Sequence, residues 1–281
     1  MPLLKRDGKP SLHYVVDDYT DPWRNAPTIV LQHGFGRSHR FWYPWIPYLS
    51  RFYRVVRADL RGLGGSPVEF DPAQGVTIAD YIGDLVDLID HLGLDRVHYC
   101  GESFGGILGM VLAAEHPSRV RTLNLVSAPV SLHEKHQQTF AVGHASREDA
   151  LRTMGARAWA AATNGTTRFP PGTDPRQLDW YADEMGRNDV EVMCALYRLL
   201  RNATAESFLP KIEAPVLGLY PESGPITSDE QVAALQRGIP HLQLVRLPTR
   251  FHSVLTLLPA TCAQHVLHFC AQHDGIACRE P

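Results

Sequence analysis

The feature that most limits the possible folds is a regular alternation of strand and helix patterns in the first half of the chain. Short runs rich in valine, isoleucine and leucine alternate with helical stretches that carry an apolar face. Strands are expected at residues 11–19, 28–34, 53–62, 96–101 and 122–128, and helices at 76–94 and 104–116. This alternation predicts a mostly parallel sheet with helices on both faces, because parallel neighbours need a crossover connection.

The alternation stops after Val130 and resumes near residue 211. Residues 131–210 show helical patterns, with a loop expected at 164–175. Strand and helix patterns then return at 214–220, 229–238, 242–248 and 262–273. We therefore predict a core formed by residues 1–130 and 211–281, with residues 131–210 inserted as a helical cap over the end of the sheet. In such sheets, ligands bind at the carboxyl ends of the strands.

A serine flanked by glycines lies at one of the transitions from strand to helix. The sequence Gly101-Glu102-Ser103-Phe104-Gly105 matches G-x-S-x-G, with a predicted strand before it and a predicted helix after it. In that context the serine occupies a sharp, strained turn that exposes its hydroxyl, and the glycines leave room for the close crossing. Ser103 is therefore the candidate nucleophile.

A serine nucleophile needs a base, and acyl transfer also needs a site for the oxyanion. His252 is the candidate base among 14 histidines, because it follows the last predicted core strand and comes after Ser103 in the chain. The candidate oxyanion donors are two backbone N–H groups. One belongs to Phe35, in the turn after His33-Gly34, and the other to Phe104, directly after the serine.

Taken together, these motifs resemble those of the α/β-hydrolase family, and the resemblance spans nearly the whole sequence. HGFG at 33–36 resembles the oxyanion turn, DLRGLGGS at 59–66 resembles the D-x-x-G-x-G-x-S stretch, and GESFGG at 101–106 resembles the nucleophile elbow. His252 with Pro259 resembles the segment around the catalytic histidine. The resemblance implies an eight-stranded, mostly parallel sheet with helices on both faces and a helical cap between strands six and seven. It implies no metal and no organic cofactor.

The family's catalytic acid has no counterpart at either of its usual places. The stretch after strand seven has Gly224 where relatives usually carry an aspartate, and residues 126–128 after strand six contain no carboxylate. Glu222 is the tentative acid, because its longer side chain could reach His252 from a displaced loop. A Ser–His dyad or a water-held His252 is the alternative, and a third is another carboxylate. Examples of that third group are Glu134, Asp189 and Asp229.

Composition and charge limit the classes of partner. The net charge is −3 with no block of like charge, which argues against a nucleic-acid or basic membrane-binding surface. No segment resembles a signal peptide or spans a bilayer, and five scattered cysteines without a CxxC pair predict free thiols in the cytoplasm. Metal binding is not expected, because neither His133 with His136 nor His265 with His268 has further ligands at the usual spacing.

Aromatic and basic residues bear on the ligand. Aromatic and methionine side chains gather after the oxyanion turn and in the predicted cap: Phe41, Trp42, Trp45, Trp159, Phe169, Trp180, Tyr181, Met185, Met193 and Tyr197. If several line a pocket, that pocket is mostly apolar, although packing is the better explanation for any single one. Arg37, His39 and Arg61 could contact a polar or anionic group or be solvated.

The sequence thus predicts hydrolysis of an ester, lactone or amide of a small, partly apolar or aromatic molecule. The same fold leaves open a C–C bond hydrolase, a lyase or a cofactor-free reaction. A different class of protein, a hydrolase-like receptor that binds a ligand and barely turns over, also stays open. The oligomeric state is not determined by the sequence.

Overall fold

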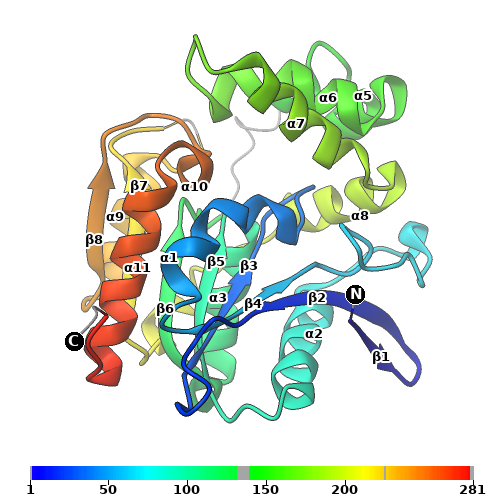
Figure 1. The fold of residues 1–281 in the computed structure, drawn as a ribbon. Helices are drawn as coiled ribbons and strands as arrows, with labels where there is room; N and C mark the ends of the chain where they lie inside the picture. Colours follow the sequence, from blue (N-terminus) through cyan, green and yellow to red (C-terminus); the bar gives the residue numbers. More distant parts are fainter. Residues whose placement is uncertain (1, 132–138, 225, 279–281) are drawn as a thin grey trace.

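The computed structural model describes residues 2–131, 139–224 and 226–278, and an eight-stranded sheet forms its centre (Figure 1). The strands lie in the order β1-β2-β4-β3-β5-β6-β7-β8. Their bounds are Leu3–Arg6 (β1), Lys9–Asp17 (β2), Thr28–Gln32 (β3), Arg54–Ala58 (β4), Val97–Glu102 (β5), Val120–Val126 (β6), Val216–Pro221 (β7) and Gln243–Leu247 (β8). The pairs β1–β2 and β2–β4 are antiparallel and all other pairs are parallel, which confirms the predicted sheet.

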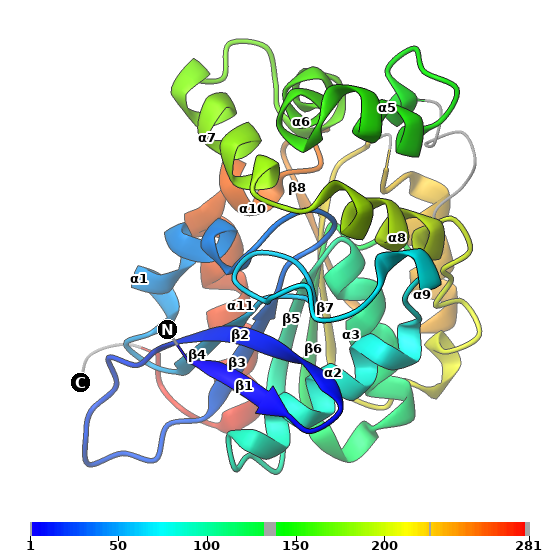
Figure 2. The ribbon, with the colours of Figure 1, turned by 90° about the vertical axis from the view of Figure 1, so that its right-hand side faces the viewer.

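Helices cover both faces of this sheet. Figure 2 shows α1 and α11 on one face and α2, α3 and α9 on the other. Their bounds are Ile46–Leu49 (α1), Ile78–His91 (α2), Phe104–Glu115 (α3), Asp229–Gly238 (α9) and Pro259–Asp274 (α11), and the short helix α10 (Val254–Leu257) precedes α11. The sheet is therefore buried on both sides, and β3, β5 and β7 contain only buried residues.

Local signals in the sequence set the ends of α2. The Thr77 hydroxyl accepts a hydrogen bond from the Asp80 N–H at 3.1 Å, and the Asp80 carboxylate accepts one from the Thr77 N–H at 2.8 Å. Gly93 follows the helix with φ of 67°, a conformation that favours glycine. A capping box and a glycine therefore bound this helix.

Two strands differ from expectation. Strand β1 was not expected from the sequence. Only Leu4 among its four residues is buried, so the strand lacks the apolar run that marks the others. Strand β4 ends at Ala58, four residues before the end of the predicted run. The chain turns away there because Asp59 accepts hydrogen bonds from the backbone N–H groups of His39 and Gly65, which hold residues 59–65 in a loop.

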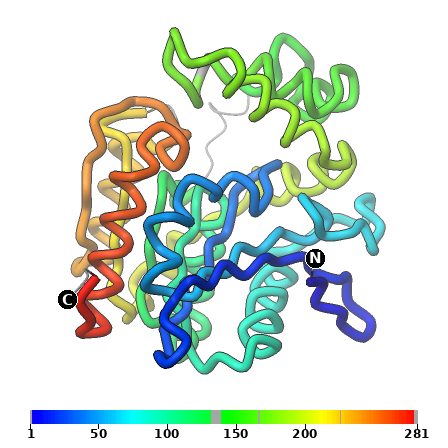
Figure 3. The backbone as a smooth tube through the Cα atoms, viewed as in Figure 1, coloured from blue at the N-terminus to red at the C-terminus, as the bar shows by residue number. Residues whose placement is uncertain are grey.

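The described residues between β6 and β7 include helices α5 to α8, which lie above the carboxyl ends of the strands and are seen in green in Figures 1 and 3. Their bounds are Arg147–Met154 (α5), Ala156–Thr163 (α6), Pro175–Gly186 (α7) and Val190–Leu200 (α8), with a π-helical turn, η4, at Asn164–Arg168. Asn188 joins them to the core: its amide donates to the Gly36 carbonyl at 2.7 Å, and its oxygen accepts from the Gly64 N–H at 2.9 Å.

Most of the aromatic residues singled out from the sequence pack the interior. Phe41, Trp42 and Trp45 after the oxyanion turn are fully buried, and so are Trp159 and Phe169 in the helical segment. Packing, rather than a pocket wall, therefore accounts for them.

Two further features bear on the environment of the protein. All five cysteines are free within the described part of the chain. Over the same residues, no helix combines the length and apolarity needed to cross a bilayer. The cytoplasmic location stays a prediction.

Candidate active site

Ser103 stands alone between a strand and a helix. Strand β5 ends at Glu102 and helix α3 begins at Phe104, so the whole change of direction falls on one residue with φ of 53° and ψ of −117°. A residue with a side chain adopts such a conformation only when the surrounding structure enforces it. Here the Ser103 N–H donates to the Val126 carbonyl at 3.0 Å, and the Ser103 carbonyl accepts from the Gly106 N–H at 2.9 Å.

The glycines of this turn are required by close backbone approach. A Cβ atom on Gly101 would lie 2.2 Å from the Gly105 carbonyl oxygen, and one on Gly106 would lie 2.2 Å from the Ala128 Cβ. Both distances are far inside van der Waals contact. The strand and the helix can therefore cross this closely only without side chains at these positions.

This packing gives a testable effect on stability. Gly101→Ala is expected to lower the free energy of unfolding by about 1–3 kcal/mol or more, because the new methyl group overlaps a backbone oxygen. The matched control is Gly83→Ala in α2, where nothing lies within 4 Å of the added Cβ, and a gain of roughly 0.5–1 kcal/mol is expected. Urea unfolding of both variants measures the difference, and equal midpoints would contradict the steric account.

The predicted oxyanion turn packs directly against Ser103. A Cβ on Gly34 would lie 2.8 Å from the Ser103 Cβ, so only glycine fits between them. His33 holds the turn: its Nε2 accepts from the Leu60 N–H at 3.1 Å, and its Nδ1–H donates to the Gly34 carbonyl at 2.8 Å. Burial lowers the pKa of His33 to about 4, so this ring is neutral at pH 7 and keeps one tautomer.

Two backbone N–H groups at the site have no hydrogen-bond acceptor among the residues that the structure describes. Phe104 is the first residue of α3, so its N–H has no partner within the helix. The N–H of Phe35 makes no hydrogen bond to any residue that the structure describes. Both residues line the same small cavity as Ser103. The candidate donors thus lie beside the candidate nucleophile.

His252 lies in the same cavity, between β8 and α10. Its side chain is buried, and its backbone N–H donates to the Thr167 carbonyl at 2.9 Å. Its Nε2 lies 3.4 Å from Oε1 of Glu102, the residue before Ser103. The structure therefore brings Ser103, His252, Phe35 and Phe104 together, and it adds a carboxylate next to the imidazole.

Glu102 belongs to a buried ion pair. Nη1 of Arg37 lies 2.7 Å from the Glu102 carboxylate. The Arg37 guanidinium also donates to the Tyr181 hydroxyl at 2.9 Å and to the Ser253 hydroxyl at 3.3 Å. Burial raises the pKa of Glu102, although the charge of Arg37 acts in the opposite direction. Arg37 thus links the serine turn, the histidine loop and helix α7.

The carboxylates proposed from the sequence lie elsewhere. Glu222 follows β7 with an exposed side chain, and its carboxylate makes no hydrogen bond or ion pair with another described residue. Asp189 caps helix α8, and exposed Asp229 pairs with Arg246 at 3.1 Å. Glu134, like His133 and His136, lies outside the described residues.

The cavity itself is small, at about 50 Å³, with room for roughly three or four water molecules. Its wall is mostly apolar, as expected, but the residues differ from those proposed. The core contributes Phe35, Phe104 and Ile107, and the segment before β7 contributes Phe140 and Leu200.

Basic side chains complete the cavity wall. Arg37, Arg147 and Arg168 all line it. Arg147 and Arg168 were missed from the sequence because they lie in helical stretches without a recognisable motif. Of the two alternatives left open for Arg37, His39 and Arg61, a solvated position is wrong, since all three are buried. Arg37 and Arg61 pair with carboxylates, and His39 hydrogen-bonds to Asp59.

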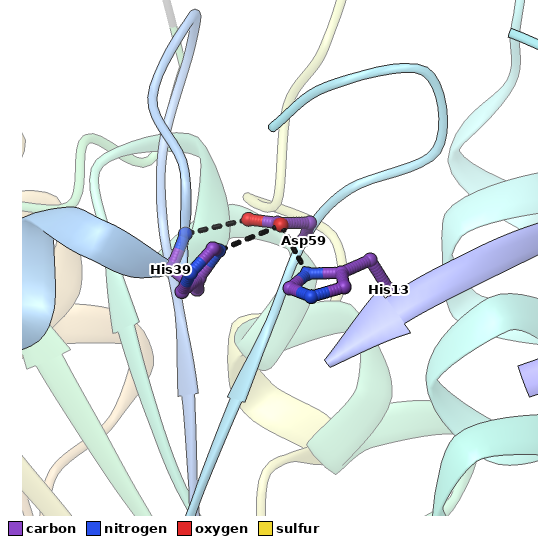
Figure 4. A group of neighbouring side chains, drawn as sticks. All are labelled: His13, His39 and Asp59. Atoms are coloured by element: carbon purple, nitrogen blue, oxygen red, sulfur yellow. Dashed lines mark hydrogen bonds and ion pairs between the residues drawn. The ribbon is translucent and has the colours of Figure 1, made fainter. Parts of the chain in front are cut away.

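One cluster among the described residues has the side chains of a metal site. Nδ1 of His13 and Nδ1 of His39 lie 2.7 and 2.8 Å from the same oxygen of Asp59 (Figure 4). These are hydrogen-bond distances, and a metal with bonds of roughly 2.0–2.2 Å would have to replace the ring protons. Burial alone would raise the pKa of Asp59, but hydrogen bonds from His13 and His39 outweigh burial and hold it well below its usual range. The geometry therefore favours a hydrogen-bonded cluster that joins strand β2, the 3-10 helix that begins at His39 and the loop after β4.

Known proteins with similar sequences are hydrolases by name. A RutD protein of Stutzerimonas stutzeri (strain A1501), named as a provisional carbamate hydrolase, is 28% identical over 84% of this chain and 88% of its own length. A RutD protein of Yersinia enterocolitica with the same designation is 30% identical over 69% of each chain.

Solved structures agree with this likeness. The enol-lactonase from Burkholderia xenovorans LB400 superposes with a TM-score of 0.84 at 26% identity, covering 96% of this chain and 100% of that one. A hydrolase from Pseudomonas aeruginosa PA01 superposes with a TM-score of 0.83 at 25% identity, covering 96% and 97%. These neighbours support hydrolytic activity. The family model described as "alpha/beta hydrolase fold" matches residues 27–256, and the chain therefore belongs to the α/β-hydrolase family.

Proposed function

We propose that the protein hydrolyses an ester, lactone or amide of a small, partly apolar or aromatic molecule, with Ser103 as the nucleophile. The observation that carries the proposal is the strained Ser103 backbone at the start of α3, inside a cavity that also contains His252. Strain of this kind costs about 1–3 kcal/mol and clusters at functional sites. The names of the relatives, an enol-lactonase and a provisional carbamate hydrolase, support acyl-group chemistry.

The proposed reaction has two steps. His252 takes the Ser103 proton while Oγ attacks the carbonyl carbon, and the Phe35 and Phe104 N–H groups stabilise the negative oxygen that develops. His252 then protonates the leaving group, and an acyl-serine remains. Water, activated by the same imidazole, releases the acid and restores the hydroxyl. No step requires a metal or an organic cofactor.

Two carboxylates are candidates for the group that orients His252. Glu222 is favoured by its place in the sequence near the family's acid position, and Glu102 is favoured by its distance of 3.4 Å from the imidazole. A histidine that works without either is the third possibility.

Residues 131–210 are proposed to act as a cap over the site. Two cross-contacts support this role: the Tyr181 hydroxyl accepts from Arg37, and the Thr167 carbonyl accepts from the His252 N–H. In addition, Phe140, Arg147 and Arg168 from this segment line the cavity. The segment thus supplies much of the surface that a substrate would contact.

A fluorophosphonate probe tests the function directly. We expect a stoichiometric adduct on Ser103, located by peptide mass spectrometry, together with hydrolysis of activated esters or lactones. An adduct without hydrolysis of any ester, lactone or amide would favour C–C bond cleavage or another reaction on this fold. No adduct and no turnover would favour a ligand-binding receptor and contradict the proposal.

A further inference from the structure

Two arginines in the cavity wall lack the carboxylate partner that buried Arg37 and Arg61 have. Arg147 is 6% exposed and Arg168 is 5% exposed, and both line the cavity of Ser103 and His252. Arg37 and Arg61, which are similarly buried, each lie 2.7 Å from a carboxylate oxygen. Within the described part of the chain, no carboxylate forms an ion pair with Arg147 or Arg168.

The contacts that these two side chains do make compensate their charge only in part. The charge of Glu102 raises the pKa of Arg168, but this carboxylate is already paired with Arg37 at 2.7 Å. The Arg147 guanidinium lies 3.8 Å from the Phe35 ring centroid and 4.6 Å from that of Trp159. Its Nε is buried and has no hydrogen-bond acceptor among the described residues. Arg168 donates one hydrogen bond to the Thr163 hydroxyl. Aromatic faces and a hydroxyl attract a cation, but more weakly than an ion-paired carboxylate does.

Burying these two positive charges therefore costs free energy unless an anion binds beside them. Burial lowers the pKa of both guanidinium groups, and the charge of Arg168 lowers that of Arg147 further, because the two lie close together. Arg147 is also the first residue of α5, where the helix dipole disfavours a cation and favours an anion. Packing alone gives no reason to place two charges here.

We propose that Arg147 and Arg168 bind a carboxylate group of the substrate, so that the substrate is a carboxylic ester, lactone or amide carrying a second, free carboxylate. A guanidinium matches a carboxylate with two parallel hydrogen bonds. A cavity of about 50 Å³ has room for a group of this size beside Ser103. This inference rests on the proposed hydrolysis for the identity of the scissile bond, but the anion site stands on the arginines themselves.

Matched substrates test the inference. Monoethyl esters of the dicarboxylic acids from succinate to adipate carry the free carboxylate at several distances, and the corresponding diethyl esters are neutral. We expect kcat/KM for the best monoethyl ester to exceed that of its diethyl ester by tenfold or more, with ethanol release as the assay. An equal or greater rate with the neutral ester would overturn the proposal.

Two variants test whether the preference for the monoethyl ester depends on these arginines. Arg147→Met and Arg168→Met keep an unbranched side chain that packs like the aliphatic part of arginine, and they remove the charge. Each is expected to lower the ratio of kcat/KM for the monoethyl over the diethyl ester by about 10- to 100-fold, through KM, because a charge-assisted hydrogen bond is lost. The matched control is Arg152→Met, since Arg152 also lies on α5 but is exposed and pairs with Glu191 at 2.8 Å. Equal losses on both esters would assign the arginines a structural role and overturn the proposal.

Direct binding separates this inference from the proposed chemistry. Calorimetric titration of Ser103→Ala with the free dicarboxylates from succinate to adipate measures binding and needs no turnover. Binding that weakens at least tenfold when Arg147→Met is added to that variant supports the anion site, even if Ser103 proves not to be a nucleophile. Failure of Ser103→Ala and of the unmodified protein to bind any of the dicarboxylates at millimolar concentration would overturn it. If Arg147→Met does not fold, the same comparison is made with Arg168→Met.

Discussion

Replacing Ser103 with alanine is expected to reduce turnover on the order of a million-fold while leaving the fold intact. The hydroxyl is the only group in the proposed mechanism that forms a covalent bond to the substrate, and losing the nucleophile of a serine hydrolase has about this effect. The substitution keeps the Cβ atom, so the strained backbone at φ of 53° is unchanged. The measurement is the steady-state rate on the best ester found, with fluorophosphonate labelling in parallel.

The matched control for this variant is Ser127→Ala. Ser127 is also a buried serine with positive φ, 46°, at the end of the neighbouring strand β6, but it does not line the cavity. It is expected to retain activity within a few-fold of the unmodified protein. If Ser103→Ala keeps more than a tenth of the activity, covalent catalysis by Ser103 is wrong.

Replacing Glu102 with glutamine is expected to lower turnover at least a hundredfold, whereas Glu222→Gln is expected to lower it less than fivefold. A carboxylate beside the imidazole stabilises the imidazolium that forms when the serine proton is taken, and its loss in other triads costs up to about ten-thousandfold. Glu102 lies 3.4 Å from His252, while the Glu222 side chain is exposed after β7. The opposite ranking of the two variants would assign the acid role to Glu222.

A structural effect of Glu102→Gln has to be separated from a catalytic one. The substitution breaks the buried ion pair with Arg37, and leaving a buried charge unpaired typically costs about 3–5 kcal/mol of stability.

Two readouts distinguish a structural effect of Glu102→Gln from a catalytic one. Urea unfolding shows whether the variant is folded at the assay temperature. The acidic limb of the pH–rate profile should also move to lower pH, because a nearby carboxylate favours the protonated imidazole. A folded variant with reduced rate and an unmoved profile would argue against contact between Glu102 and the base. If both variants lose less than fivefold, His252 works without either carboxylate.

The sheet and the positions of Ser103 and His252 followed from local patterns in the sequence. Alternating apolar runs predict strands and helices, and parallel strands place their carboxyl ends at one edge. Ser103 and His252 each follow a strand, so both were expected at that edge without knowledge of side-chain packing. The glycine requirement at Gly101 and Gly106 is equally local, because it arises where a strand crosses the helix that follows it.

Only the tertiary structure decided which charges meet. Arg147 and Arg168 lie 44 and 65 residues after Ser103, the first in a helical pattern and the second in a predicted loop, and nothing in the chain marks them as buried. Glu102 occupies a position of the G-x-S-x-G motif that any residue can fill, and its proximity to His252 and Arg37 depends on loops from three separate elements. Burial and pairing of a side chain are properties of the packed fold: an arginine that is a solvated surface group on one helix face can be buried without a carboxylate partner on another. The proposed reaction class therefore follows from motifs, whereas the candidate acid and the proposed carboxylate of the substrate follow from packing.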